Sequence, residues 1–459
     1  MGDVSRVSEV PLRYDPAWTY TFHIVLGHAT EPRIVMLPGE EGWHLPNFLS
    51  REHDLRAVGH LQRASRRRLN VEGIALRCLH VDRTRADDKR GAAVFALEDA
   101  GRAWSPPGGA RWVGRAELAQ LPLARPAHRP IIGAWLHRAG DRAGVEAIHP
   151  WVLPGWYATA AAWAGARLRD LGHGPVAAIQ QVRSWGLSCV LRLQTPGGVA
   201  YLKALPPEYA SEVALTRFLS ARHPDHLPPV LATDDARRWL LLGDAGPPMD
   251  DDDLTHWEAA VTLLARLQIA SADYLEQALR TGCPDQRPSA LAAQVDRLVG
   301  DADVRAALDA AEYARLRVLA PALKARCAQL AAYGLPSTVV HGDLHTGNIA
   351  IRRGHPVFVD WGDGCVAHPF FALFALLDEH YFPKGVPEVG ARLRALYLPQ
   401  WSAYAPPERL REALGLAESL AVLRYTLGCQ RCFSSLDATW RMELLPTLRS
   451  CLQTLLRRA

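Results

Sequence analysis

Some apolar residues in the first 150 positions occur in short strand-like runs, and others recur at helical spacing. This pattern predicts a domain built from both strands and helices. Strand-like apolar runs occupy residues 20–27, 33–37, 74–81 and 92–97, and a basic segment over 52–69 has helical spacing. A proline-rich stretch follows the last of these runs. We therefore predict an N-terminal domain over residues 1–150.

Glycine and proline punctuate residues 139–154, which favours a linker over a continued helix or strand. Alanine, tryptophan and leucine then recur at helical spacing over 156–171, so a helix is expected there. Alternating strands dominate the next part of the chain, and apolar helical periodicity dominates the last 200 or so residues. We expect two further domains, over 151–245 and 246–459.

Two short polar segments in the last domain carry the most specific chemistry. The segment His341-Gly342-Asp343-Leu344-His345-Thr346-Gly347-Asn348 has the spacing of a kinase catalytic loop, and Asp360-Trp361-Gly362 follows it after a strand-like run. Phosphoryl transfer needs a carboxylate that orients the attacking hydroxyl and oxygen ligands that hold Mg²⁺. Asp343 suits the first task, and Asn348 with Asp360 suits the second. The alternative interpretation is a polar hairpin between two strands.

A lysine far upstream supports the catalytic interpretation. The alternating segment 198–205 contains Lys203, in the position of the lysine that contacts the nucleotide phosphates in kinases. A helix is expected over 209–221, and Glu212 near its start is a candidate partner that would aim the ammonium group. An exposed lysine–glutamate pair is the alternative.

Two further segments are candidate nucleotide contacts. A turn between the strand-like runs 176–182 and 190–193 contains Ser184, Gly186 and Ser188, whose backbone N–H groups and hydroxyls would cover phosphates; a plain β-turn is the alternative. The apolar run 239–244 reads as a buried strand that ends in a turn. It contains Leu242 and Asp244, and it would present backbone groups to adenine or serve only as a core strand.

From about Trp156 to the C-terminus, the chain resembles the aminoglycoside phosphotransferase family, which includes choline, homoserine and fructosamine kinases. Lys203, Glu212, the loop from His341 to Asn348, and Asp360 match the family's motifs in their order. The resemblance implies an α+β, bilobal protein-kinase-like fold that uses ATP and Mg²⁺. In that scheme we expect His341 to brace the loop. The resemblance does not identify the molecule that accepts the phosphoryl group, because one fold serves many acceptors.

The first domain resembles a Nudix domain, through Trp43-His44-Leu45-Pro46 and through Arg111-Trp112-Val113 with Glu117-Leu118. That family hydrolyses with metal-binding glutamates, and the alignment places Ala64, Arg67 and Arg68 at their positions. Guanidinium groups supply no oxygen ligand and repel a cation. We therefore expect a non-hydrolytic Nudix-like module. It would serve as a lid, a homodimer surface or a substrate-recognition element, or would be purely structural.

Composition excludes several other classes of protein. Apolar residues make up 49% and charged residues 22% of the 459 residues, as in an ordinary globular protein, and the net charge is only +4. The arginines over 63–68 are expected on a solvated helix, so we predict no nucleic-acid partner.

No apolar run is long enough for a membrane span, and residues 1–11 contain no signal sequence. Eight scattered cysteines favour the cytoplasm, and Cys429 and Cys432, which form a CxxC, are expected to be structural.

The acceptor is predicted only as a class. No Ala-Pro-Glu sequence closes a peptide-binding segment after Asp360, and Val386-Pro387-Glu388 reads as an ordinary loop. We therefore expect a small hydroxylated molecule, such as an amino sugar, a nucleoside or an amino alcohol. The acidic run 250–253 is interpreted as a solvated turn that caps a helix near Leu254, or as an attractant for a cationic acceptor. The competing hypothesis is a catalytically silent pseudokinase that only binds.

Overall fold

The structure is a computed structural model that describes residues 17–458, apart from 29, 85, 102, 103, 105, 141–148, 379–381, 384 and 385. The predictions for residues 1–11 and for the middle of the 139–154 linker lie outside the described residues. By their internal contacts, the described residues divide into two units. The N-terminal unit comprises 17–206 with 437–440, and the C-terminal unit comprises 207–436 with 441–458. This division falls inside the region predicted as the second domain.

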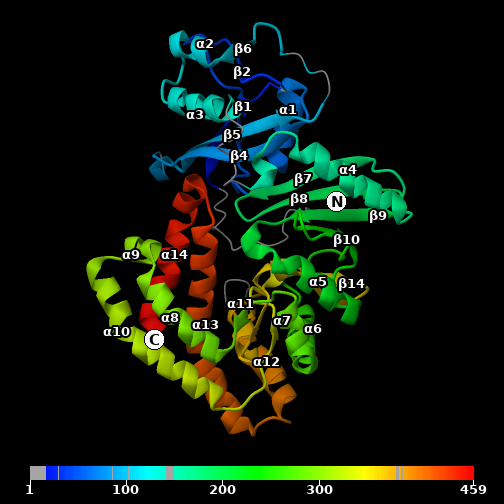
Figure 1. The fold of residues 1–459 in the computed structure, drawn as a ribbon, viewed down its shortest axis with the longest axis vertical. Helices are drawn as coiled ribbons and strands as arrows, with labels where there is room; N and C mark the ends of the chain where they lie inside the picture. Colours follow the sequence, from blue (N-terminus) through cyan, green and yellow to red (C-terminus); the bar gives the residue numbers. More distant parts are fainter. Residues whose placement is uncertain are drawn as a thin grey trace. The chain divides into compact units, whose positions relative to one another are not determined.

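The N-terminal unit begins with a four-stranded sheet in the order β3-β1-β5-β4. Figure 1 labels β1, β5 and β4 of this sheet. Its strands are β1 (Thr19–Leu26), β3 (Asn47–Ser50), β4 (Gly73–Asp82) and β5 (Arg90–Asp99). β1 and β5 run parallel, and the two outer pairings are antiparallel. A separate two-stranded ribbon pairs β2 (Arg33–Met36) with β6 (Arg111–Gly114). The strands predicted from the apolar runs are confirmed.

Two helices close one side of this domain. α2 (Arg115–Gln120) and α3 (His128–Gly140) contribute Leu118 and Ile132 to a buried cluster that also contains Val25 of β1 and Val113 of β6. Alternate residues of each strand face this cluster because side chains along a strand point to opposite faces. The apolar period of the sequence is therefore sufficient to explain which faces are buried.

The basic helix of this domain is shorter than predicted. α1 spans Gly59–Leu69, so the prediction of a helix from residue 52 is wrong for its first seven residues. Asp54 accepts hydrogen bonds from the backbone and the side chain of Arg56, and Ala57 forms a β-bridge with Arg183. Such local side-chain bonds compete with helix formation. Since Arg183 is distant in the sequence, helical periodicity alone could not reveal the bridge.

A second, antiparallel sheet completes the N-terminal unit. It follows α4 (Trp156–Asp170), which confirms the helix predicted there, and contains β7 (Ala178–Trp185), β8 (Ser188–Thr195) and β9 (Gly198–Ala204). Gln181 of β7 joins it to the first sheet, because its side chain bonds both the N–H and the carbonyl of Ala75 at 2.8 Å. The buried amide of Gln181 is thus fully paired with β4, as a buried polar group requires.

The C-terminal unit is mainly helical. Its helices are α5 (Ser211–Arg222), α6 (Leu254–Ser271), α7 (Leu275–Arg280), α8 (Pro288–Gly300), α9 (Ala302–Ala307), α10 (Ala310–Ala331), α11 (Leu373–Leu376), α12 (Val389–Tyr397), α13 (Pro407–Ser434) and most of α14 (Ala438–Arg458). Figure 1 shows α8, α10 and α13 side by side, and these helices pack against one another. Asp253 caps α6 by accepting from the N–H of Thr255, which confirms the helix-capping interpretation of the acidic run.

The C-terminal unit also contains short strands. β10 (Val230–Asp234) pairs with β11 (Trp239–Gly243), β14 (Ile349–Arg352) with β15 (His355–Phe358), and β12 (Asp285–Gln286), β16 (Cys365–Ala367) and β13 (Thr338–Val340) form a three-stranded sheet. Val386 and Glu388 lie just before α12, which confirms the predicted loop. None of the helices in the described part of the chain is both long and apolar enough to cross a membrane.

Candidate active site

The hairpin β14–β15 brings the two predicted metal ligands to one end. Ile349 pairs with Phe358, so Asn348, just before β14, and Asp360, two residues after β15, come to the same end of the hairpin. The N–H of Val359 donates to the carbonyl of Asn348 at 3.0 Å and extends this pairing. The twelve-residue separation in the sequence is thus bridged by ordinary antiparallel register.

The loop between β13 and β14 has backbone conformations that few residues adopt. Gly342 has φ 87°, and a Cβ at this position would lie 2.1 Å from the carbonyl oxygen of Asp363. Only glycine fits such a close approach at positive φ. Asp360 itself has φ 64° and ψ 66°, in the left-handed region. Strain of this kind gathers at functional sites, where the surrounding structure maintains it.

The side chain of His341 bonds to the backbone beyond the loop. Its buried ring donates a hydrogen bond from Nε2 to the carbonyl of Val359 at 2.8 Å and lies 4.6 Å from the Trp361 ring. Burial lowers the pKa of His341 to about 4, so the ring is neutral at pH 7. A neutral ring beneath the loop connects the 341–348 segment to the 360–362 segment without contributing charge.

Asp343 lies among other charged groups. Burial, with the carboxylates of Asp363 and Asp360, raises its pKa to about 7, and the Arg424 guanidinium opposes this rise. The ring of His345 lies 3.7 Å from its Oδ2. The Asp343 side chain keeps 22% of its surface exposed, so another molecule can reach it. A carboxylate with these properties can accept a proton from a hydroxyl near neutral pH.

Asn348 has the properties of a metal ligand. Its Nδ2 donates to the carbonyl of Asp343 at 2.8 Å, which fixes the amide, while its buried Oδ1 has no hydrogen-bond partner among the described residues. An unsatisfied buried acceptor is unfavourable unless a ligand completes it. Together with Asp360 it supplies two oxygens, the kind of set Mg²⁺ uses when phosphates and water provide the rest. Within the described residues, no three His, Cys, Asp or Glu side chains form a metal-binding group.

The two members of the predicted lysine–glutamate pair belong to different units. Lys203 lies on β9, opposite Val190 of β8. Glu212 is buried in the first turn of α5. A Cβ on Gly362 would lie 3.0 Å from Glu212 Oε2, so this carboxylate lies against the Asp360–Gly362 segment. Glu212 is thus near the predicted metal site within its own unit.

The predicted phosphate-covering turn is tighter than expected. β7 runs to Trp185 and β8 begins at Ser188, so the turn contains only Gly186 and Leu187. The hydroxyl of Ser184 donates to the carbonyl of Ala75 at 3.3 Å, and its hydrogen is not available to a phosphate. The hydroxyl of Ser188 accepts from Trp185 Nε1 at 3.1 Å and keeps its hydrogen.

The predicted adenine-contacting strand is confirmed as a strand. Leu242 lies in β11 between the buried Leu241 and Gly243 and is itself only partly buried. Asp244 follows the strand, is exposed, and accepts a hydrogen bond from the N–H of Gly246 at 3.0 Å. Asp244 therefore shapes the turn after β11.

Three functional candidates on α13 were not identified from the sequence. Arg424 is buried and donates to the carbonyl of Gly342, and Arg431 forms an ion pair with Asp363 at 3.1 Å. Tyr425 is close enough to Asp343 and Asp363 for their negative charges to act on its hydroxyl. Burial and these charges raise the pKa of Tyr425. No local motif marks these residues, because they lie more than 60 positions after the loop.

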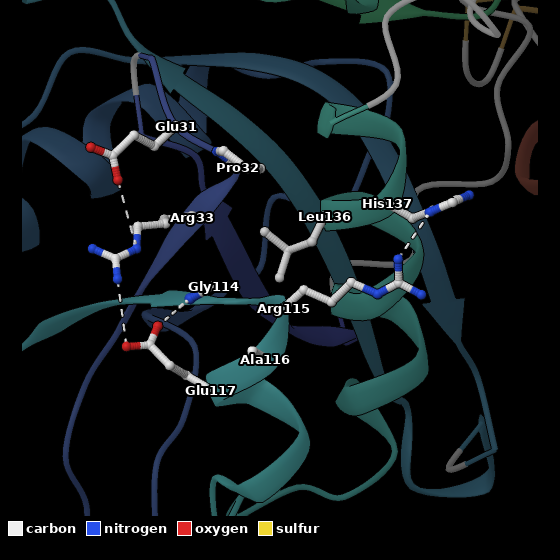
Figure 2. A pocket seen from close by; sticks show the side chains of 9 residues that line it. All are labelled: Glu31, Pro32, Arg33, Gly114, Arg115, Ala116, Glu117, Leu136 and His137. Carbon is white, nitrogen blue, oxygen red and sulfur yellow. Dashed lines mark hydrogen bonds and ion pairs between the residues drawn. The ribbon is translucent and has the colours of Figure 1, made fainter.

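A separate cavity lies in the N-terminal unit (Figure 2). It has a volume of about 920 Å³ and is lined by Glu31, Pro32, Arg33, Gly114, Arg115, Ala116, Glu117, Leu136 and His137. Arg33 pairs with Glu31 at 3.7 Å and with Glu117 at 3.5 Å, and Arg115 donates to His137 at 3.3 Å. The charges in this cavity are therefore largely balanced by one another.

Comparison with known protein families finds a match over the middle and later part of the chain. Residues 180–407, just under half of the sequence, match the family described as the phosphotransferase enzyme family, APH. No curated protein matches the chain.

Several solved structures are similar to the chain. A macrolide 2'-phosphotransferase type I is 17% identical, with 63% of this chain and 96% of that chain covered and a TM-score of 0.43. Plasmodium vivax ethanolamine kinase is 12% identical, with coverages of 61% and 84% and a TM-score of 0.45. The choline kinase LicA from Streptococcus pneumoniae is 12% identical, with coverages of 64% and 98% and a TM-score of 0.45. From the family match over residues 180–407, the protein is an enzyme that transfers a phosphoryl group to an alcohol, with its phosphotransferase domain in this region.

Proposed function

We propose that this protein is an ATP- and Mg²⁺-dependent kinase that phosphorylates a hydroxyl of a small metabolite, such as an amino sugar, a nucleoside or an amino alcohol. The observation that carries the proposal is the buried Oδ1 of Asn348, which has no hydrogen-bond partner among the described residues. Asn348 lies on the same loop as Asp343 and at the same hairpin end as Asp360. Together these side chains provide a carboxylate to orient the attacking hydroxyl and oxygen ligands for Mg²⁺, the two requirements of phosphoryl transfer.

Asp343 is the group that handles the acceptor. It hydrogen-bonds the attacking hydroxyl and receives the proton late in transfer. Asn348 and Asp360 would hold Mg²⁺, which when bound neutralises charge on the transferring phosphoryl group. His341 positions the loop through its bond to Val359. The partly exposed carboxylate of Asp343 supports this assignment, since an acceptor can approach it.

The nucleotide contacts in this proposal are those that the sequence predicts. Lys203 contacts the α- and β-phosphates, and Glu212 remains the carboxylate expected to aim an ammonium group. The N–H groups of the Gly186 turn, together with the Ser188 hydroxyl, cover the phosphates. Leu242 lies beside the adenine. The family match, which includes all of these residues, supports the arrangement.

A thermal-shift assay tests binding and an ADP-release screen tests chemistry. We expect Mg²⁺-ATP to raise the melting temperature, and at least one amino sugar, nucleoside or amino alcohol to stimulate ADP release. Asp343→Asn should abolish release and preserve the thermal shift, whereas Asp252→Asn, at an exposed position, should change neither. A shift without release for any acceptor would instead favour the pseudokinase hypothesis, in which the fold only binds.

The N-terminal domain is proposed as a Nudix-like module without hydrolase activity. Arg66 on α1 pairs with Glu72 at 2.6 Å and Arg63 pairs with Glu52, so the helix is a salt-bridged basic surface. This supports a recognition, lid, homodimer or purely structural role over metal-assisted hydrolysis. The full-length Asp343→Asn protein tests it: metal-dependent hydrolysis of nucleoside diphosphate derivatives by this variant would contradict the proposal. Sedimentation would report a homodimer.

We propose that the enzyme is located in the cytoplasm. All eight cysteines are free thiols, which supports a reducing compartment. Fractionation of cells that express the full chain would test this assignment.

A further inference from the structure

The cysteines of the CxxC sequence do not face each other as a pair. Cys429 and Cys432 both lie on α13, three residues apart, and the Sγ of Cys429 instead contacts the Sγ of Cys451 on α14 at 3.4 Å. The contact joins two helices that are consecutive in the chain. Cys432 makes its contact elsewhere, with the hydroxyl of Tyr209.

These three cysteines are less buried than the others. Five of the eight cysteines, namely Cys78, Cys189, Cys283, Cys327 and Cys365, are buried, whereas Cys429, Cys432 and Cys451 are partly exposed. Both members of the α13–α14 pair therefore belong to this partly exposed group. Two sulfur atoms 3.4 Å apart must move together by only about 1.4 Å to reach the roughly 2.05 Å of a disulfide bond.

The environment of the pair distinguishes its two thiols. The hydrogen bond between the two thiols lowers the pKa of Cys451 and raises that of Cys429. Burial raises the pKa of Cys432 to about 12, which makes this neighbour a poor nucleophile. The short Sγ–Sγ distance and the raised pKa of Cys432 both favour reaction of the Cys429–Cys451 pair over reaction of Cys432.

We propose that Cys429 and Cys451 form a dithiol that closes reversibly to a disulfide when it meets a small-molecule disulfide such as oxidised glutathione. The Cys451 thiolate attacks one glutathione sulfur, breaks the S–S bond and releases one glutathione thiolate, which takes up a proton. Cys429 then loses its proton and attacks the Cys451 sulfur, which releases the second glutathione. Two protein thiols are oxidised, and one glutathione disulfide is reduced to two thiols.

The disulfide would lie close to the candidate active site. Tyr425 precedes Cys429 by one helical turn and lies within electrostatic range of both thiols and of Asp343 and Asp363. Oxidation would tether α14 to the helix that carries Arg424 and Arg431. The inference itself depends only on the thiol pair and stands independently of the proposed acceptor and cofactor.

Peptide mapping of the full-length protein tests the proposal. Reduced protein is treated with excess oxidised glutathione, its remaining thiols are alkylated under denaturing conditions, and peptides are analysed by mass spectrometry. We expect a cross-linked peptide pair containing Cys429 and Cys451, the loss of two alkylation sites, and full reversal by dithiothreitol.

Single substitutions provide the controls. Cys429→Ser should leave glutathione attached to Cys451, and Cys429→Ala serves as a second variant if the serine variant misfolds. Cys432→Ser, one turn away on the same helix, should form the cross-link as wild type does. The proposal is overturned if the cross-link forms through Cys432, or if native protein exposed to glutathione disulfide keeps both Cys429 and Cys451 as thiols.

Discussion

The guanidinium of Arg424 donates a hydrogen bond to the carbonyl of Gly342, across 82 positions of sequence. Arg424 is buried on α13 and also donates to Gln286 Oε1 at 3.3 Å. Its positive charge favours the ionised form of Asp343, against the effect of burial and of two neighbouring carboxylates. Helix α13, which is distant in the sequence, therefore positions the 341–348 loop and lowers the pKa of Asp343.

Replacement of Arg424 should reduce turnover more than nucleotide affinity. Arg424→Met removes a charged donor, and the loss of such a bond is worth about 1.5–3 kcal/mol, or roughly 10- to 100-fold in kcat. Because a cation beside Asp343 disappears, its pKa should rise, and the rate should reach its plateau at a higher pH. ADP release against pH measures both effects. Arg411→Met, at an exposed position on α13, is the matched control and should resemble wild type. An unchanged pH profile in Arg424→Met would contradict the tuning role.

Asn348→Ala should increase the Mg²⁺ requirement. The substitution removes the Oδ1, to which no described residue donates a hydrogen bond, and the Nδ2 bond to the carbonyl of Asp343. We expect at least a 100-fold loss of kcat at low Mg²⁺, of the order seen when one electrostatic stabiliser is removed, with partial recovery as Mg²⁺ rises. A titration of Mg²⁺ in the ADP-release assay checks this expectation.

The control for Asn348 is another asparagine with a similar bond. Asn47 also donates from Nδ2 to a main-chain carbonyl, that of Leu45 at 3.1 Å, but lies in the N-terminal domain. Asn47→Ala should leave the Mg²⁺ dependence unchanged. An identical Mg²⁺ curve for Asn348→Ala and wild type would show that Asn348 is not a ligand.

Gly342→Ala should be far more damaging than Gly354→Ala. Both glycines have positive φ, 87° and 80°, so alanine at either position costs about 1–2 kcal/mol in backbone strain. Only at Gly342 would the new Cβ collide with another group, the carbonyl of Asp363. We expect Gly342→Ala to lose most activity and Gly354→Ala to keep it, with a modest drop in melting temperature. Equal effects of the two substitutions would mean that the close approach is unimportant.

The buried His23 should make the N-terminal unit sensitive to acid. Burial, with His128 and Arg125 nearby, lowers the pKa of His23 to about 3, so the folded protein holds this ring neutral. Between pH 6.5 and 3 the unfolded chain binds a proton that the folded chain does not, and stability falls as pH falls. The loss at pH 4 is on the order of 2–3 kcal/mol from this residue.

Urea unfolding at several pH values measures this contribution. His23→Met should flatten the dependence of the unfolding midpoint on pH between 6.5 and 4, because the titrating group is gone. His137→Met, at an exposed position in the same unit, should keep the wild-type slope. If His23→Met also keeps that slope, another buried group dominates the acid sensitivity.

The sequence by itself determined the elements and the local part of the site. Asp343, Asn348 and Asp360 lie within 18 positions of one another, and a single hairpin with regular register brings the last two together. Apolar periodicity was sufficient for most strands and helices, because burial of one face repeats at a fixed spacing. It failed at the start of α1, where the bridge from Ala57 to Arg183 competes with the helix.

Only the tertiary structure decided which distant side chains complete the site. Arg424, Arg431 and the Cys429–Cys451 pair lie on long helices whose apolar pattern shows the buried face but not the partner of each polar group. Those partners depend on how α13 packs against the catalytic loop and α14, and contacts between remote elements leave no periodic signal in the sequence. The hydrogen bond of Arg424 to the Gly342 carbonyl therefore appears only after the chain has folded.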